Sequence, residues 1–171
     1  MKIRSKIIPI IFLIVLMIES IEFFNLNSGM MKTLDFNFHV LQDNLTRMVL
    51  IVKNKDLNDE KSQETAKTLI EKSFIAVSNI NDISADSILY QGYYMKKTEN
   101  FILYSMVNLD SLSAGKKEML LQLCESFQAE QFGLPNTDKG VYNFISDHQK
   151  IKESVMKIEE MFVSESNQKV K

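Results

Sequence analysis

The sequence predicts an all-α protein, in which an N-terminal transmembrane or signal-anchor helix is followed by an antiparallel bundle of four to five helices. Three observations lead to this fold class. Apolar residues recur in long segments at alternating steps of three and four residues, which is the spacing of an amphipathic helix. Only five Gly and two Pro occur in 171 residues, which disfavours an all-β fold with many tight turns. The chain also begins with a basic segment followed by an uncharged apolar run.

The N-terminal segment predicts where the protein is located. Lys2, Arg4 and Lys6 precede the run Ile7–Ile18, which contains no charged residue. Apolar residues continue beyond this run, and a helix over Ile7–Phe24 would span roughly 27 Å of a bilayer. Positive charge is retained on the cytoplasmic side of a membrane. We therefore expect a single-pass protein of the bacterial inner membrane, with a cytoplasmic N-terminus and an extracytoplasmic domain.

A cleaved signal peptide is the alternative to an anchor. The 12 uncharged residues also match the length of the apolar region of a signal peptide. Cleavage requires small residues at the −3 and −1 positions, yet no Ala precedes Ala66, and Ser20 has Ile18 two positions before it. We therefore expect segment 1–24 to remain attached as a signal-anchor, and we keep a cleaved, periplasmic or secreted protein as the alternative.

The composition predicts one exported domain that is held together by packing. Residues 25–165 are enough for a single core, and residues 166–171 form a flexible tail. All 22 acidic residues but only 17 of the 20 basic ones follow Ile18, so the exported part carries a net charge near −5. Nucleic acid is not an expected partner, because its binding requires clustered positive charge. The single cysteine, Cys124, predicts a buried thiol and no intrachain disulfide.

The first two helices of the domain are expected over Thr33–Asn54 and from Asn58 to about Ile80. The first helix has a heptad seam, formed by Leu34, Phe38, Leu41, Leu45, Met48 and Val52. Asn58 is the expected N-cap of the second helix, with Asp59 and Glu60 in the favourable first turn. The apolar face of this helix consists of Ala66, Ile70, Phe74, Val77 and Ile80.

Three further helices are expected after a turn at Asn81–Ser84. The third helix, over about Ala85–Leu112, has its seam at Met95, Ile102, Met106 and Leu109. A break at Ser113–Gly115 precedes the fourth helix, whose apolar residues are Leu120, Leu123, Cys124 and Phe127. The segment Gly133–Pro135 predicts the end of that helix. The last helix is expected over Val141–Ser164.

Two groups of side chains are candidate binding sites. Aromatic rings with polar tips suit a contact with a protein or ligand, and such a group lies beside Gly92, formed by Tyr90, Tyr93 and Tyr94. Metal ligands can share one helix face at steps of four residues, as do Asp35, His39 and Asp43. The plainer interpretations are an aromatic layer of the core for the tyrosines and a solvated helix face for the other three residues.

The sequence predicts a protein that is not an enzyme and has no cofactor. It lacks the nucleophile motif G-x-S-x-G, a Gly-rich phosphate loop and the zinc motif HExxH. The order of its segments resembles the input half of four-helix-bundle bacterial sensory receptors. That resemblance implies a free-standing, sensor-like or accessory subunit, which contacts a protein or small ligand and could form a homo-oligomer.

One feature limits this resemblance. Such receptors return through the membrane by a second apolar helix, and the sequence contains no second run of that length. A complete transducer is therefore not expected. The alternative function, which goes with a cleaved signal peptide, is a secreted or periplasmic immunity or inhibitor protein.

Overall fold

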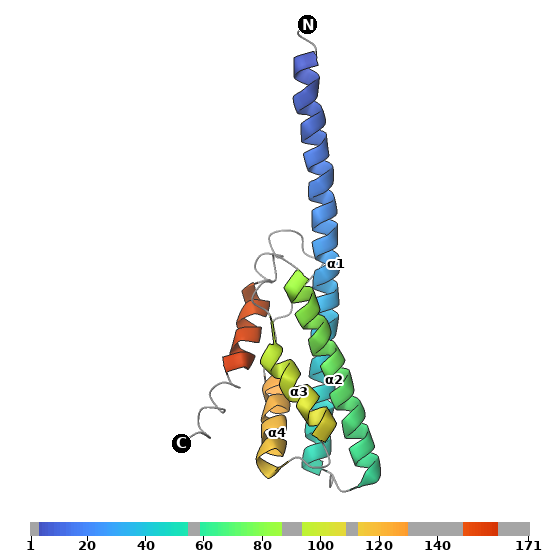
Figure 1. The fold of residues 1–171 in the computed structure, drawn as a ribbon, viewed down its shortest axis with the longest axis vertical. Coiled ribbons are helices and arrows are strands. Elements are labelled where there is room, and N and C mark those ends of the chain that lie inside the picture. The colour runs from blue at the N-terminus through green and yellow to red at the C-terminus, as the bar shows by residue number, and fades with distance from the viewer. Residues whose placement is uncertain (1–3, 55–58, 87–93, 109–112, 130–148, 161–171) are drawn as a thin grey trace.

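Five helices account for nearly all of the chain that the computed structural model describes, which is residues 4–54, 59–86, 94–108, 113–129 and 149–160. They are α1 (Arg4–Asn54), α2 (Glu60–Asp86), α3 (Lys96–Asn108), α4 (Ala114–Ala129) and a last helix over residues 149–160. Figure 1 shows that α1 extends far beyond the other helices, which gather along its C-terminal part. None of the described residues is in a strand, so the predicted all-α class is confirmed.

The first helix is continuous over 51 residues, a length of about 76 Å at 1.5 Å per residue. It joins the predicted anchor to the first predicted helix of the domain. Two polar side chains near this junction bond to the backbone of the helix itself. Asn27 Nδ2 donates to the Phe23 carbonyl oxygen at 2.8 Å, and Thr33 Oγ1 donates to the Gly29 carbonyl oxygen at 3.0 Å.

The packed segment of α1, residues 27–51, forms an antiparallel pair with α2. The two helices follow each other closely in sequence at Asn54 and Glu60. At the other end of the pair, Asn79 Nδ2 donates to Asn37 Oδ1 at 3.0 Å. The predicted heptad seam is buried, at Leu34, Phe38, Leu41, Leu45 and Met48. The side chain of Val52 lies outside the described residues.

The second helix begins at an aspartate cap. Asp59 Oδ2 accepts hydrogen bonds from the Ser62 backbone N–H at 2.9 Å and from Ser62 Oγ at 2.6 Å. This is the usual N-cap arrangement, in which a side-chain oxygen satisfies a backbone donor of the first turn. Asp59 therefore performs the capping that was expected of Asn58, which lies outside the described residues.

The turn expected at Asn81–Ser84 is wrong, because α2 continues through these residues to Asp86. Both polar side chains are buried within the fold and bonded there. Asn81 Nδ2 donates to Glu99 Oε2 at 2.7 Å, and Ser84 Oγ donates to the Ile80 carbonyl oxygen at 2.7 Å. Satisfied polar groups of this kind can remain in a buried helix.

The third helix starts at Lys96, later than expected, so the predicted helix over Ala85–Leu112 is wrong in its first part. Tyr94 and Met95 precede it and are not helical. Asn81 Oδ1 accepts the backbone N–H of Met95, which places the start of α3 against α2. From the predicted seam Met95 and Ile102 are buried and Met106 is half-buried.

The fourth and last helices add further apolar residues to the core. The predicted break at Ser113–Gly115 is wrong for Ala114 and Gly115, because α4 begins at Ala114. The Ser113 carbonyl oxygen accepts the N–H groups of Lys116 and Lys117 in the first turn of α4. The α4 helix packs on α1 and contributes Leu120, Leu123 and Cys124 to the core. The last helix buries Ile151, Val155 and Ile158. Thr98 Oγ1 of α3 donates to Glu159 Oε1 of this helix at 3.3 Å.

Candidate functional sites

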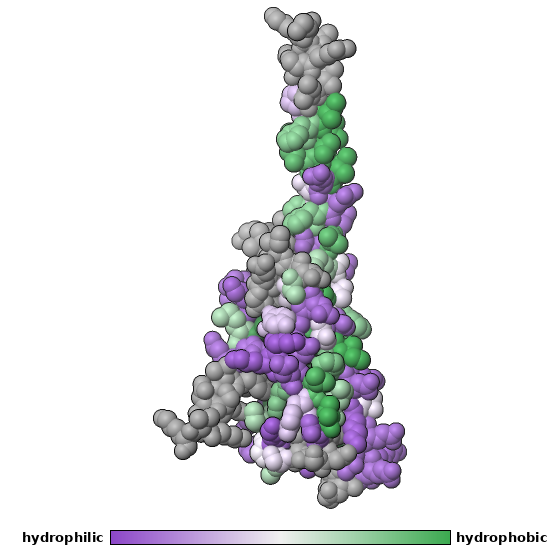
Figure 2. All heavy atoms as spheres, viewed as in Figure 1, coloured by the Kyte–Doolittle hydropathy of each residue, from purple (hydrophilic) through white to green (hydrophobic). Residues whose placement is uncertain are grey.

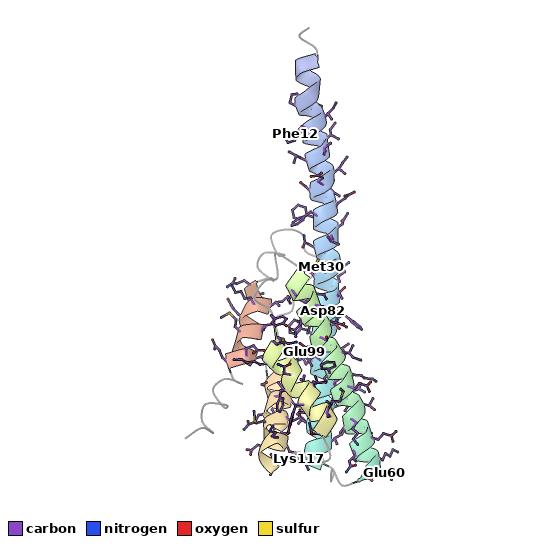
Figure 3. The ribbon with its side chains drawn as sticks, viewed as in Figure 1. Phe12, Met30, Glu60, Asp82, Glu99 and Lys117 are labelled. Atoms are coloured by element: carbon purple, nitrogen blue, oxygen red, sulfur yellow. The ribbon has the colours of Figure 1, made fainter. Side chains whose placement is uncertain are left out.

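The N-terminal part of α1 is an apolar segment, residues 9–26, in which every side chain is exposed. Thirteen of these residues are large and apolar: Ile10, Ile11, Phe12, Leu13, Ile14, Val15, Leu16, Met17, Ile18, Ile21, Phe23, Phe24 and Leu26. Apolar side chains form a green band on the projecting part of α1 (Figure 2), and Phe12 lies far from the other helices (Figure 3). A helix that is apolar on all sides requires an apolar environment on all sides.

In the part of the chain that the structure describes, α1 is the one helix long and apolar enough to cross a membrane. Its length and composition suit a membrane anchor or a signal sequence. The polar side chains of this segment are few. Ser20 Oγ bonds to the Leu16 carbonyl oxygen at 2.6 Å, and Glu19 and Glu22 lie three residues apart on one side of the helix.

Only one of the three candidate tyrosines is described. Tyr94 is exposed and lies just before α3, whereas Tyr90 and Tyr93 lie outside the described residues. Lys96 Nζ lies 5.9 Å from the centroid of the Tyr94 ring and 3.1 Å from Glu99 Oε2. The expectation that all three tyrosines share one helix is wrong for Tyr94, which precedes the helix. Their role as a contact surface stays a prediction.

The three candidate metal ligands lie on one side of α1, but they interact with different partners. Asp35 Oδ1 lies 3.5 Å from His39 Nδ1, and the same nitrogen lies 2.9 Å from the Asp35 carbonyl oxygen. Partial burial raises the pKa of Asp35, and His39 opposes that shift. Asp43 Oδ2 lies 3.0 Å from an Arg47 guanidinium nitrogen. A metal ion at this site would have to compete with that ion pair, and the described residues contain no group of three ligands placed to hold one.

The single thiol has the predicted buried environment. Cys124 is fully buried in α4. Burial raises the pKa of its thiol to about 12, so the reactive thiolate is scarce at neutral pH. This thiol is therefore suited to packing rather than to chemistry.

The sequence interpretation missed the apolar outer face of α3, which carries Leu103, Tyr104 and Val107. Its signal was present, because these residues lie at steps of one and three on the side of the helix opposite Ile102. The predicted seam included only residues on the inner side.

Comparison of the chain with protein-family models, with curated proteins and with solved structures finds no match.

Proposed function

We propose that the protein is anchored in a membrane by the apolar segment of α1 and presents the remaining helices, as a bundle, outside the cytoplasm. There it acts by contact with another protein or a ligand, as a sensor-like or accessory subunit. The observation that carries this proposal is the change in side-chain burial along one unbroken helix. The apolar segment is exposed on all sides, and the packed segment is buried along one seam.

The dimensions of α1 fit such an anchor. Residues 7–26 form about six turns and would span roughly 30 Å, which matches the hydrocarbon core of a bilayer. Asn27 is the first buried residue among the described side chains of the helix, so the packed domain begins where the hydrocarbon would end. Glu19 and Glu22 would then lie about 10 Å and about 6 Å inside the outer boundary of that core.

The orientation and the retention of the anchor have separate support. The three basic residues before Ile7 favour a cytoplasmic N-terminus. The helix continues through Ser20 and Gly29 without a break, and small residues are missing at the positions that a signal peptidase requires. Both observations favour an uncleaved anchor over a secreted immunity or inhibitor protein.

A topology experiment tests the proposal with the chain's own thiol as a control. Glu64 is exposed on α2, so a Glu64→Cys variant should react with a membrane-impermeant maleimide added to intact spheroplasts. The parent chain should stay unlabelled, because Cys124 is buried and protonated. Washing the membranes with alkaline carbonate should leave both chains in the pellet. Labelling only after lysis, or release into the soluble fraction, would refute the anchor or its orientation.

A further inference from the structure

The third helix carries large apolar residues on its outer side in addition to those that face the core. Its buried residues are Thr98, Ile102 and Ser105. Leu103, Tyr104 and Val107 are 38%, 41% and 72% exposed. At 100° per residue these three side chains lie on the side of the helix opposite Ile102. We define the outer face of α3 as Asn100, Leu103, Tyr104 and Val107. These residues lie at positions i, i+3, i+4 and i+7, which is the spacing with which a helix contacts an apolar surface.

The hydrogen bonds that attach α3 to its neighbours come from residues outside this outer face. Asn81 of α2 bonds to Glu99 at 2.7 Å and to the backbone N–H of Met95. Ile102 enters the core, and Thr98 bonds to Glu159 of the last helix. The fold therefore attaches α3 largely through its inner side and its N-terminal end. On the outer side, Leu103 and Val107 remain exposed.

Lysines border the outer face. Lys96 and Lys97 are exposed in the first turn of α3, where Lys96 pairs with Glu99 at 3.1 Å. At the other end, Lys116 of α4 places its Nζ 3.6 Å from the centroid of the Tyr104 ring, and Lys117 follows it in the first turn of α4. The part of the chain after Ile18 has a net charge near −5, so this basic border departs from the charge of the rest. It complements acidic side chains.

The location of the outer face excludes the anchoring membrane as its partner. The first turn of α4, with Lys117, lies at the end of the molecule opposite Phe12 (Figure 3), and the C-terminal end of α3 points to the same end (Figure 1). A bilayer around the apolar segment of α1 would lie beyond the other end of the packed helices. The partner must therefore approach from the surrounding solution or from another molecule.

We propose that the outer face of α3 is a docking site for an amphipathic acidic helix of another protein. Apolar side chains of that helix would cover Leu103, Tyr104 and Val107, and its carboxylates would pair with Lys97 and Lys116. This inference rests on the proposed contact function and names the surface and the class of partner.

Photocrosslinking in native membranes tests the docking site. The full chain carries p-benzoylphenylalanine in place of Val107, or in place of Glu64 as an exposed control on α2, and crosslinked peptides are identified by mass spectrometry. We expect a crosslink from position 107 to an acidic amphipathic segment of a different protein, and no such crosslink from position 64. The charge-reversed variant Lys97→Glu/Lys116→Glu should lower its yield by about tenfold.

The outcomes separate this inference from the proposed function. A crosslink to a second copy of the chain, to lipid or to a non-acidic segment overturns the docking site, and so does the absence of a crosslink. In each case the chain can still resist carbonate extraction, which leaves the anchor intact. The charge-reversed variant counts only if its melting temperature matches the parent. If it does not, Lys97→Gln/Lys116→Gln replaces it, with a smaller loss of yield expected.

Discussion

The two segments of α1 share one backbone conformation and differ in what surrounds them. In residues 9–26 every side chain is exposed, whichever way it points. In residues 27–51 exposure follows the helical period, so that Phe36 is 66% exposed and Phe38, two residues later, is 1% exposed. The difference shows that helicity alone does not determine burial. The distribution of apolar residues around the helix determines whether lipid or other helices can cover it.

The largest effect is expected where the packed segment is most buried. Phe38→Ala should lower the free energy of unfolding by about 3–5 kcal/mol, because a buried aromatic ring is replaced by a cavity. Phe36→Ala on the same helix should change it by less than about 0.5 kcal/mol. Chemical denaturation of the two variants measures both values. Equal effects of the two substitutions would contradict the burial of only one side of the packed segment.

A charge in the apolar segment tests whether lipid covers it. Leu13→Arg places a guanidinium near the middle of the proposed span, at a cost of about 2.5–3.5 kcal/mol for membrane insertion. Leu50→Arg adds the same charge at an exposed position of the packed segment and should leave insertion unchanged. The fraction that resists carbonate extraction reports the difference. If Leu13→Arg is retained as well as Leu50→Arg, the apolar segment is not in lipid.

Two buried asparagines of the packed segment should respond in opposite ways to replacement by leucine. Asn44 is 6% exposed, and its Nδ2 has no hydrogen-bond partner among the residues that the structure describes. Asn44→Leu should therefore stabilise the fold by about 1–3 kcal/mol, because an unsatisfied buried donor is removed. Asn37→Leu loses the bonds of Asn37 to Asn79 and to the Thr33 carbonyl oxygen and should destabilise. Thermal unfolding decides, and a lower melting temperature for Asn44→Leu would indicate that its amide is satisfied.

The smallest effect concerns pH and the last helix. Partial burial raises the pKa of Glu159 above 4.5, against the opposing effects of Thr98 and Lys97. The folded protein then binds more protons at this group than the unfolded chain. Stability should fall as the pH rises from 4.5 through the folded pKa.

Glu159→Gln should remove this part of the pH dependence, while Glu153→Gln on the exposed side of the same helix should not. Amide hydrogen exchange of the last helix, followed between acidic and neutral pH, measures the dependence. If the slopes of both variants equal that of the parent, Glu159 does not titrate in this range.

The sequence predicted those features that depend on a local period. The seam of Leu34, Phe38 and Leu41 repeats within one helix, and an amphipathic helix in water requires that repeat to face a core. The continuity of α1 was not predicted, because the anchor was expected to end at Phe24 and the next helix to begin at Thr33. Helix propensity differs by only about 1 kcal/mol per residue, and side-chain bonds to the backbone satisfy the polar residues there.

The junction of α2 and α3 could not be predicted, because it depends on contacts between segments. Asn81 forms its bonds to Met95 and Glu99, which are 14 and 18 residues away, and no local pattern contains that information. For the same reason Tyr94 was assigned to a helix that begins only at Lys96. Of the candidate sites, the positions of Asp35, His39 and Asp43 on one side of α1 followed from spacing. The ion pair of Asp43 with Arg47 was overlooked.

Because α1 has no break between Arg4 and Asn54, the direction in which the domain faces is set by a count of residues. A Cβ at Gly29 would meet nothing within 4 Å, so this position can be altered without a clash. One residue inserted there would rotate everything after it by about 100° and displace it by about 1.5 Å along the axis. Seven inserted residues would restore the original direction to within about 20° and displace the domain by about 10 Å. The rotation of the outer face of α3 about the α1 axis, and its distance from the membrane, can thus be changed without altering the residues that form the face.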